Sequence, residues 1–68
     1  MDEEVFKIQL RRFLKKVGIQ SQREIEKAVR QGIATGALTS TGKLNAQMLL
    51  RVPAVGVDVI IEDEIALD

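Results

Sequence analysis

The side-chain types that most often perform catalysis are scarce in this chain. Its 68 residues include no His, no Cys and no Tyr, which removes the commonest general bases, thiol nucleophiles and imidazole or thiolate metal ligands. Carboxylates are the remaining candidates, and Asp58, Glu62 and Glu64 stand close together in the sequence. Alternating hydrophobicity around them predicts that they are spread along the solvent-facing side of a strand. We therefore expect no catalytic residues.

Patterns for binding cofactors are missing as well. Gly32, Gly36 and Gly42 match no glycine-rich nucleotide motif, and the acidic residues lack the spacing of a calcium-binding loop. Ser21 and Ser40 are interpreted as a helix cap and a loop residue. The sequence thus favours a protein that is not an enzyme, with no cofactor, no metal site and no small-molecule substrate.

The stretch from Gly18 to Glu24 predicts the end of one helix and the start of another. Gly18 suits the left-handed conformation that follows a helix C-terminus. Ser21 and Glu24 have the three-residue spacing of a capping box, in which each side chain accepts a hydrogen bond from the backbone of the other. We expect helices over residues 3–17 and 21–35.

Both predicted helices are amphipathic. At 100° per residue, the apolar side chains of 3–17 fall within a sector of about 100°, and those of 21–35 also share a face. The short connection favours an antiparallel or steeply angled helical hairpin. The residues expected to pack inside are Phe6, Leu10, Phe13, Leu14 and Val17 in the first helix and Ile25, Ala28, Val29, Gly32 and Ile33 in the second.

The periodicity changes after a loop over residues 36–43. From Leu44 onward, apolar and polar side chains alternate, as in a half-buried strand. Pro53 favours the start of a turn, and Gly56 supplies the left-handed position that returns the chain. The sequence therefore predicts a strand over 44–52, a turn over 53–56 and a strand over 57–67.

The register of this hairpin follows from keeping both apolar rows on one face. The same register puts Asp63 opposite Ala46 on that face, where a carboxylate is disfavoured. We expect a bulge or a second turn at 62–64, which would give residues 65–67 a short strand or packing of their own. The predicted opposite pairs are Val52 with Val57, Arg51 with Asp58 and Leu49 with Ile60.

The predicted fold is α+β with the order α-α-β-β. A two-helix hairpin packs on one face of an antiparallel β-hairpin, and residues 1–68 form one small domain. Residues 1–43 carry nine Lys or Arg and five Asp or Glu, whereas 44–68 carry one and five. This asymmetry favours packing of a basic helical half on an acidic strand half.

Basic residues recur at helical spacing in both predicted helices. They form a candidate surface for an anion such as nucleic acid. No aromatic side chains are interleaved with them to stack on bases, and a solvated face explains the charges more simply. Whether this face binds anything stays open. Its candidate residues are Lys7, Arg11, Lys15, Arg23 and Lys27.

The helix–Gly–helix junction is similar to the helix-turn-helix motif that binds DNA. That motif has a small residue four positions before the turn glycine and apolar residues one, six and nine positions after it. Ile19 fits, but Leu14 is large, and Glu24 and Lys27 are charged. We therefore rank weak nucleic-acid binding as the alternative function.

Surplus apolar side chains favour association with another protein. Ile8 lies on the polar side of the first predicted helix, and Leu49 pairs with Ile60 on the outer face of the hairpin. Both strands also have free edges that can accept a further strand. We expect a protein–protein interaction or homodimerisation module, with Ile8, Leu49 and Ile60 as the candidate association surface.

Three segments of the chain resemble a family of small bacterial proteins to which no activity is assigned. They are Phe-Leu-Lys-Lys-Val-Gly-Ile at 13–19, Ser-Gln-Arg-Glu-Ile-Glu-Lys-Ala-Val at 21–29, and the strand–Pro–x–x–Gly–strand ending. The resemblance implies a stand-alone bacterial domain. It supplies no catalytic or binding residues.

The sequence also predicts a cytoplasmic protein without a membrane partner. Met1 is followed by three acidic residues, so the basic start and apolar run of a signal peptide are missing. No apolar run approaches the roughly 20 residues that span a bilayer.

Overall fold

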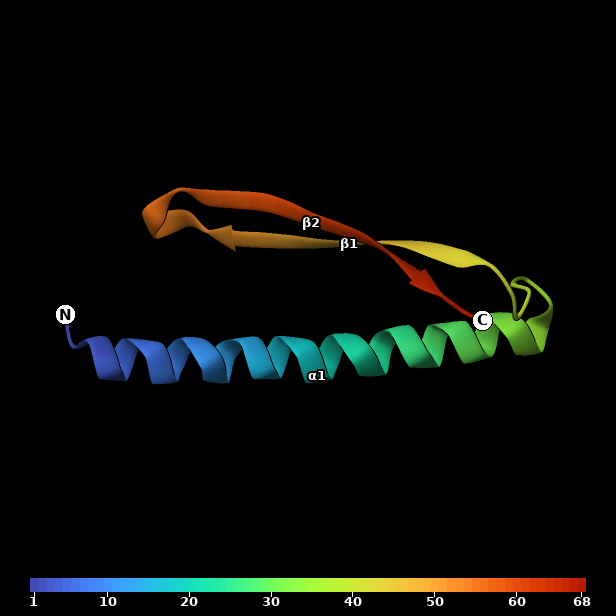
Figure 1. The fold of residues 1–68 in the computed structure, drawn as a ribbon, viewed down its shortest axis with the longest axis horizontal. Coiled ribbons are helices and arrows are strands. Elements are labelled where there is room, and N and C mark those ends of the chain that lie inside the picture. The colour runs from blue at the N-terminus through green and yellow to red at the C-terminus, as the bar shows by residue number, and fades with distance from the viewer. The chain divides into compact units, whose positions relative to one another are not determined.

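A computed structural model describes residues 1–68 and contains one long helix and one β-hairpin (Figure 1). Residue contacts divide the chain into two compact units, Met1–Leu38 and Thr39–Asp68, here termed the helix unit and the hairpin unit. The elements are the α-helix α1 (Glu3–Thr35), the strand β1 (Lys43–Val52), the short 3-10 helix η1 (Pro53–Val55) and the strand β2 (Val57–Ala66).

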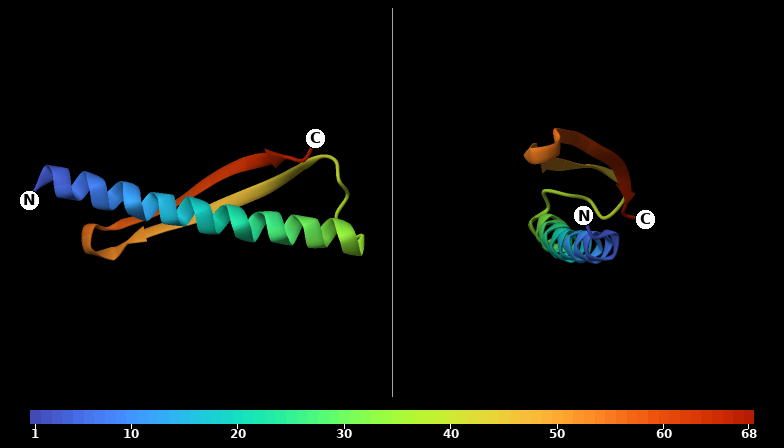
Figure 2. Two further views of the ribbon diagram at one scale, coloured as in Figure 1. Left: turned by 90° about the horizontal axis from the view of Figure 1, so that it is seen from below. Right: turned by 90° about the vertical axis from the view of Figure 1, so that its left-hand side faces the viewer.

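The prediction of a two-helix hairpin is wrong, because α1 runs without interruption through Gly18 (Figures 1 and 2). Gly18 does not adopt a positive φ, and Ser21 and Glu24 lie inside the helix rather than at its start. Glycine inside a helix costs about 1 kcal/mol. Ending one helix and starting another would instead leave four C=O and four N–H groups without intrahelical partners. The continuous helix therefore prevails.

α1 is capped at both ends, by Asp2 at the N-terminus and by Gly36 at the C-terminus. The Asp2 carboxylate accepts hydrogen bonds from the backbone N–H groups of Glu4 at 3.0 Å and Val5 at 3.2 Å, which satisfies two free donors of the first turn. At the other end, Gly36 has φ 80° and donates its N–H to the Ile33 carbonyl at 3.2 Å. A left-handed glycine is a common helix stop.

Gly32 permits close packing of the segment that follows α1, and not of a second helix. The N–H of Leu38 donates to the Gly32 carbonyl at 3.0 Å. A Cβ on Gly32 would lie 3.2 Å from the Leu38 Cβ, so the missing side chain admits Leu38 close to the helix.

The hairpin forms in the register that the sequence predicts. Val52 lies opposite Val57, Arg51 opposite Asp58, and Leu49 opposite Ile60. Between the strands, Gly56 has φ 69° and donates its N–H to the Pro53 carbonyl at 3.1 Å. The alternation of apolar residues was sufficient here because a one-residue shift would move every apolar side chain to the opposite face.

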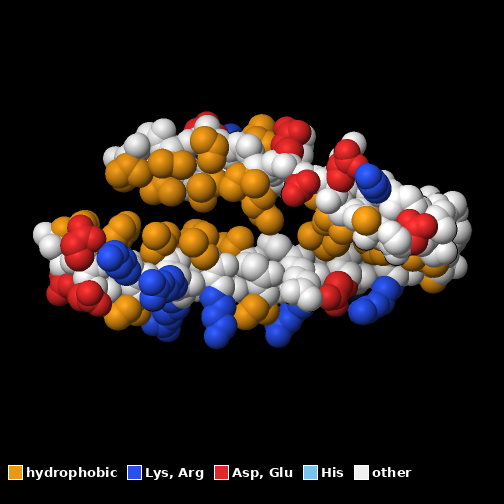
Figure 3. Space-filling model, viewed as in Figure 1, with side chains coloured by type: hydrophobic (Ala, Val, Ile, Leu, Met, Phe, Trp, Pro, Cys, Tyr) orange, Lys and Arg blue, Asp and Glu red, His pale blue; other side chains and the backbone are white.

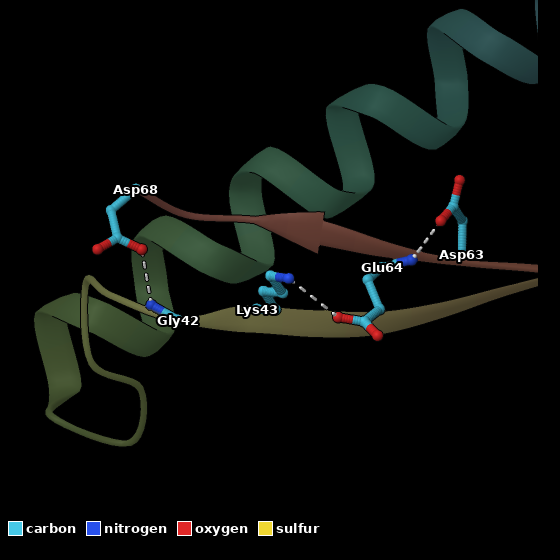
Figure 4. A network of polar contacts seen from close by, with 5 residues as sticks. All are labelled: Gly42, Lys43, Asp63, Glu64 and Asp68. Atoms are coloured by element: carbon cyan, nitrogen blue, oxygen red, sulfur yellow. Dashed lines mark hydrogen bonds and ion pairs between the residues drawn. The ribbon is translucent and has the colours of Figure 1, made fainter.

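The predicted interruption at 62–64 does not occur. β2 continues to Ala66, and Asp63 pairs with Ala46 in the unbroken ladder. The small Ala46 leaves room beside the carboxylate, and no residue of the chain is buried, so Asp63 retains water and needs no bulge. The open end of the hairpin is closed by two hydrogen bonds of Gly42. Its carbonyl accepts from the N–H of Leu67, and its N–H donates to the Asp68 carboxylate (Figure 4).

The apolar residues expected to form a core are only partly covered. Phe6 is 49% exposed, Phe13 and Leu14 are each 51% exposed, and no side chain anywhere in the chain is buried. The fold remains α+β, but its apolar surfaces lie open.

Gly18→Ala is expected to stabilise the protein by about 0.5–1 kcal/mol, because alanine is favoured over glycine inside a helix. A Cβ at this position meets no atom within 4 Å. Thermal unfolding followed by circular dichroism at 222 nm measures the change. Gly36→Ala is the matched control and should destabilise by about 1–2 kcal/mol, since its φ is positive. A lower melting temperature for Gly18→Ala would indicate a turn at Gly18 and contradict the single helix.

Candidate interaction surfaces

One side of α1 carries a stripe of mostly apolar residues, and apolar side chains gather along the upper side of its N-terminal half in Figure 3. Its residues repeat at spacings of four, four and three, a repeat of eleven residues. Eleven residues per three turns is close to the natural period of an α-helix, so the stripe follows the helix with little drift. We define the helix stripe as Phe6, Leu10, Leu14, Val17, Ser21, Ile25, Ala28 and Gly32.

The predicted break at Gly18 hides this stripe in the sequence. The prediction divides its residues between two helices, with Ser21 as a cap and the others inside the fold. The signal that reveals it is the spacing across the assumed break, since Leu14, Val17, Ser21 and Ile25 keep the repeat on both sides of Gly18. Because α1 is continuous, residues that keep this spacing on both sides of Gly18 lie on the same side of the helix.

Basic side chains form a ridge on the side of α1 away from the helix stripe (Figure 3). At 100° per residue they fall within a sector of about 60°, centred about 150° from the stripe. The sector contains no acidic residue. We define the basic ridge as Arg12, Lys16, Arg23, Lys27 and Arg30.

The candidate anion-binding residues of the sequence divide between two sides of α1. Arg23 and Lys27 belong to the basic ridge. Lys7 and Arg11 flank the helix stripe instead, about 120° or more around the helix from Arg23. Lys15 lies closer to the ridge, about 80° from Arg23. An open groove on the ridge side is lined by Arg12, Lys15, Lys16, Ile19, Gln20 and Arg23.

The hairpin has one apolar and one polar face. On the polar face, Arg51 and Asp58 form an ion pair at 3.6 Å. The Gln47 amide donates to Glu62 at 3.3 Å, and Lys43 pairs diagonally with Glu64 at 3.9 Å (Figure 4). The apolar face comprises Leu44, Ala46, Met48, Leu50, Val52, Val57, Val59, Ile61 and Ile65, with Asp63 as its charged member.

The three residues of the predicted association surface lie on both units. Leu49 and Ile60 are directly opposite each other on the polar face of the hairpin, where they are 54% and 57% exposed. Ile8 belongs to the helix unit and lies about 150° around α1 from the helix stripe. The pairing of Leu49 with Ile60 is confirmed, and their role in association stays a prediction.

Sites for small ligands are not formed by the chain. No group of three or more His, Cys, Asp or Glu side chains is placed to hold a metal ion, and no buried polar side-chain atom lacks a hydrogen-bond partner. α1 does not combine the length and hydropathy required of a membrane-spanning helix. The surfaces that remain for function are the helix stripe, the basic ridge and the two hairpin faces.

Comparison with protein families gives a match over the whole chain. The matching model carries the description "Family of unknown function (DUF6494)" and covers residues 1–68. The chain belongs to this family. The resemblance to a family without an assigned activity is thereby confirmed. No curated protein matches this DUF6494 chain, and no solved structure does.

Asp63→Thr in this DUF6494 protein is expected to stabilise the hairpin by about 0.5–1 kcal/mol. Threonine has a higher strand propensity than aspartate, and the change removes the charge that interrupts the apolar face. Asp58→Thr is the matched control in the same strand. It gains the same propensity but loses the ion pair with Arg51, which is worth at most about 1 kcal/mol at the surface, so its effect should be near zero. Thermal unfolding of both variants measures the difference, and an unchanged midpoint for Asp63→Thr would place Asp63 outside the strand ladder.

Proposed function

We propose that this protein is a non-enzymatic protein–protein interaction module that acts as a homodimer. The observation that carries the proposal is the area left in contact with solvent. No side chain of either unit is buried, and large apolar side chains of both are about half exposed, among them Phe6 at 49%, Leu14 at 51% and Ile61 at 58%. Apolar surface of this kind marks a site of association with a partner.

Neither unit has the means to be stable by itself. A two-stranded hairpin is marginally stable in water, and most helices in proteins depend on packing of an amphipathic face. Small domains compensate with disulfides or metals, but this chain has no cysteine and no metal-binding cluster. Burial of apolar side chains against another chain supplies the missing stability.

A second copy of the chain is the partner that these surfaces favour. Self-association covers the same surface on both copies, so one chain provides a complete interface through a two-fold axis. The helix stripe is the strongest candidate, since it extends over most of α1 and its Phe6, Leu10 and Leu14 are 43–51% exposed. The absence of His and Cys supports a function in binding rather than in catalysis.

Leu14→Glu is expected to weaken the dimer by at least tenfold in Kd, because it places a charge on the helix stripe. Sedimentation equilibrium between about 1 and 100 μM, a range that brackets the usual Kd of weak to moderate dimers, measures the mass. Ile19→Glu is the matched control. Ile19 is similarly exposed, at 43% against 51% for Leu14, but lies on the opposite side of the helix, so its variant should remain dimeric. A monomeric mass for the unaltered protein at every concentration would contradict the proposal.

Binding of a polyanion such as nucleic acid is the second candidate function. The observation that favours it is the alignment of five basic side chains in the basic ridge, which the continuous helix produces. Glu26 is ion-paired with Arg30 at 3.7 Å, and the other four members have no carboxylate partner within ion-pair distance. The ridge lies away from the helix stripe and stays free in a dimer.

The combined change of Arg23→Gln and Lys27→Gln is expected to weaken binding to single-stranded DNA and to lower the salt slope by about 1.4, or about 0.7 for each phosphate that is no longer neutralised. Fluorescence anisotropy at several salt concentrations measures both quantities. Lys7→Gln with Arg11→Gln is the control, since it removes the same charge, again from one Lys and one Arg, at positions outside the ridge and its groove. Equal effects of both pairs would show binding by net charge alone, and no binding at low salt would reject this candidate.

A further inference from the structure

We infer that two copies of this chain pair through the helix stripe with their α1 helices antiparallel. This inference rests on the proposed homodimer and specifies its geometry. The stripe is uneven along its length. Its N-terminal half carries the bulky Phe6, Leu10, Leu14 and Val17, whereas its C-terminal half is mostly small, with Ser21, Ala28 and Gly32 beside Ile25.

Antiparallel pairing matches the bulky half of one helix with the small half of the other. A two-fold axis near residue 19 brings Leu10 opposite Ala28 of the second copy, and Val17 opposite its Ser21. Leu14 falls beside Ile25 in the same register. Phe6 reaches the Gly32 end of the stripe, where Leu38 fills the position of the missing side chain. The bulky N-terminal halves of the two copies thereby lie at opposite ends of the interface, which distributes their volume more evenly, as close packing requires.

Parallel pairing would distribute the same side chains unevenly. Phe6, Leu10 and Leu14 would each meet their own copies at one end, and Ala28 and Gly32 would meet theirs at the other. Helix axes pack 8–10 Å apart according to the side chains between them. A parallel pair would be overfilled at one end or hollow at the other, and either fault costs packing energy.

The residues that flank the helix stripe are compatible with the antiparallel arrangement. Lys7 and Arg11 line one edge of its N-terminal half. A two-fold axis perpendicular to the helices places this edge against the same edge of the second copy, in reversed direction. There it meets Gln22 and Val29, over which the aliphatic parts of Lys and Arg side chains can lie while their charges reach water.

Disulfide trapping tests the orientation, because the chain has no cysteine of its own. Leu10→Cys and Ala28→Cys are prepared as separate single variants and oxidised alone or as a mixture. Antiparallel pairing predicts a disulfide-linked dimer in the mixture and none in either variant alone, since the two copies of residue 10 would be about 27 Å apart along the helices. A disulfide needs Cα atoms within about 7 Å.

A second stripe pair and an off-stripe pair complete the design. Leu14→Cys mixed with Ile25→Cys should also crosslink, which retains the test if the change at Leu10 loosens the fold. Ile8→Cys mixed with Arg30→Cys has the same register but lies off the stripe, so it should not crosslink. Crosslinks within Leu10→Cys alone would overturn the antiparallel orientation. So would absence of crosslinks from both stripe pairs.

Sedimentation of the same reduced variants separates the two levels of the proposal. Dimeric variants that crosslink in the parallel pattern, or not at all, would reject the antiparallel helix pairing and leave the homodimer standing. Monomeric unaltered protein would reject both. Crosslinking of the two stripe pairs only in their mixtures, together with a dimeric mass, supports both.

Discussion

The apolar side of a 33-residue helix is the constraint on which the rest of this structure depends. A helix this long extends about 50 Å, and it cannot cover its own stripe. No side chain of the chain is buried, and Phe6, Phe13 and Leu14 remain about half exposed. Since apolar burial is the dominant favourable term in folding, the stability of the protein has to come from a surface that the helix meets rather than from the helix itself.

The continuity of α1 determines which surfaces exist at all. If the chain turned back at Gly18, the stripe would become two short patches and the basic residues would separate. In the uninterrupted helix, the eleven-residue repeat joins Phe6 to Gly32 on one side, and Arg12 to Arg30 align on the other. One side of the same element is thereby suited to another apolar surface and the opposite side to water or an anion, and the two uses do not compete.

Local patterns in the sequence predicted the hairpin but not the helix, for physical reasons that differ. The pairs Leu49–Ile60 and Arg51–Asp58 follow from alternation, because a strand register is fixed wherever one face is apolar. Gly18 and the Ser21–Glu24 spacing are equally local, yet they compete with a ladder of intrahelical hydrogen bonds that costs more to break. The bulge expected at Asp63 presumed a dry interior, whereas no side chain of the chain is buried. The basic ridge depends on a helical phase that is lost if the helix is assumed to end at Gly18.

Thermal unfolding over a hundredfold range of protein concentration tests most directly whether the folded state is a pair of chains. When folding and dimerisation are coupled, each tenfold increase in concentration stabilises the dimer by about 1.4 kcal/mol. The account predicts an unfolding midpoint, followed by circular dichroism, that rises by several degrees across the range. An identical midpoint at every concentration would mean that the chain folds alone and would contradict it.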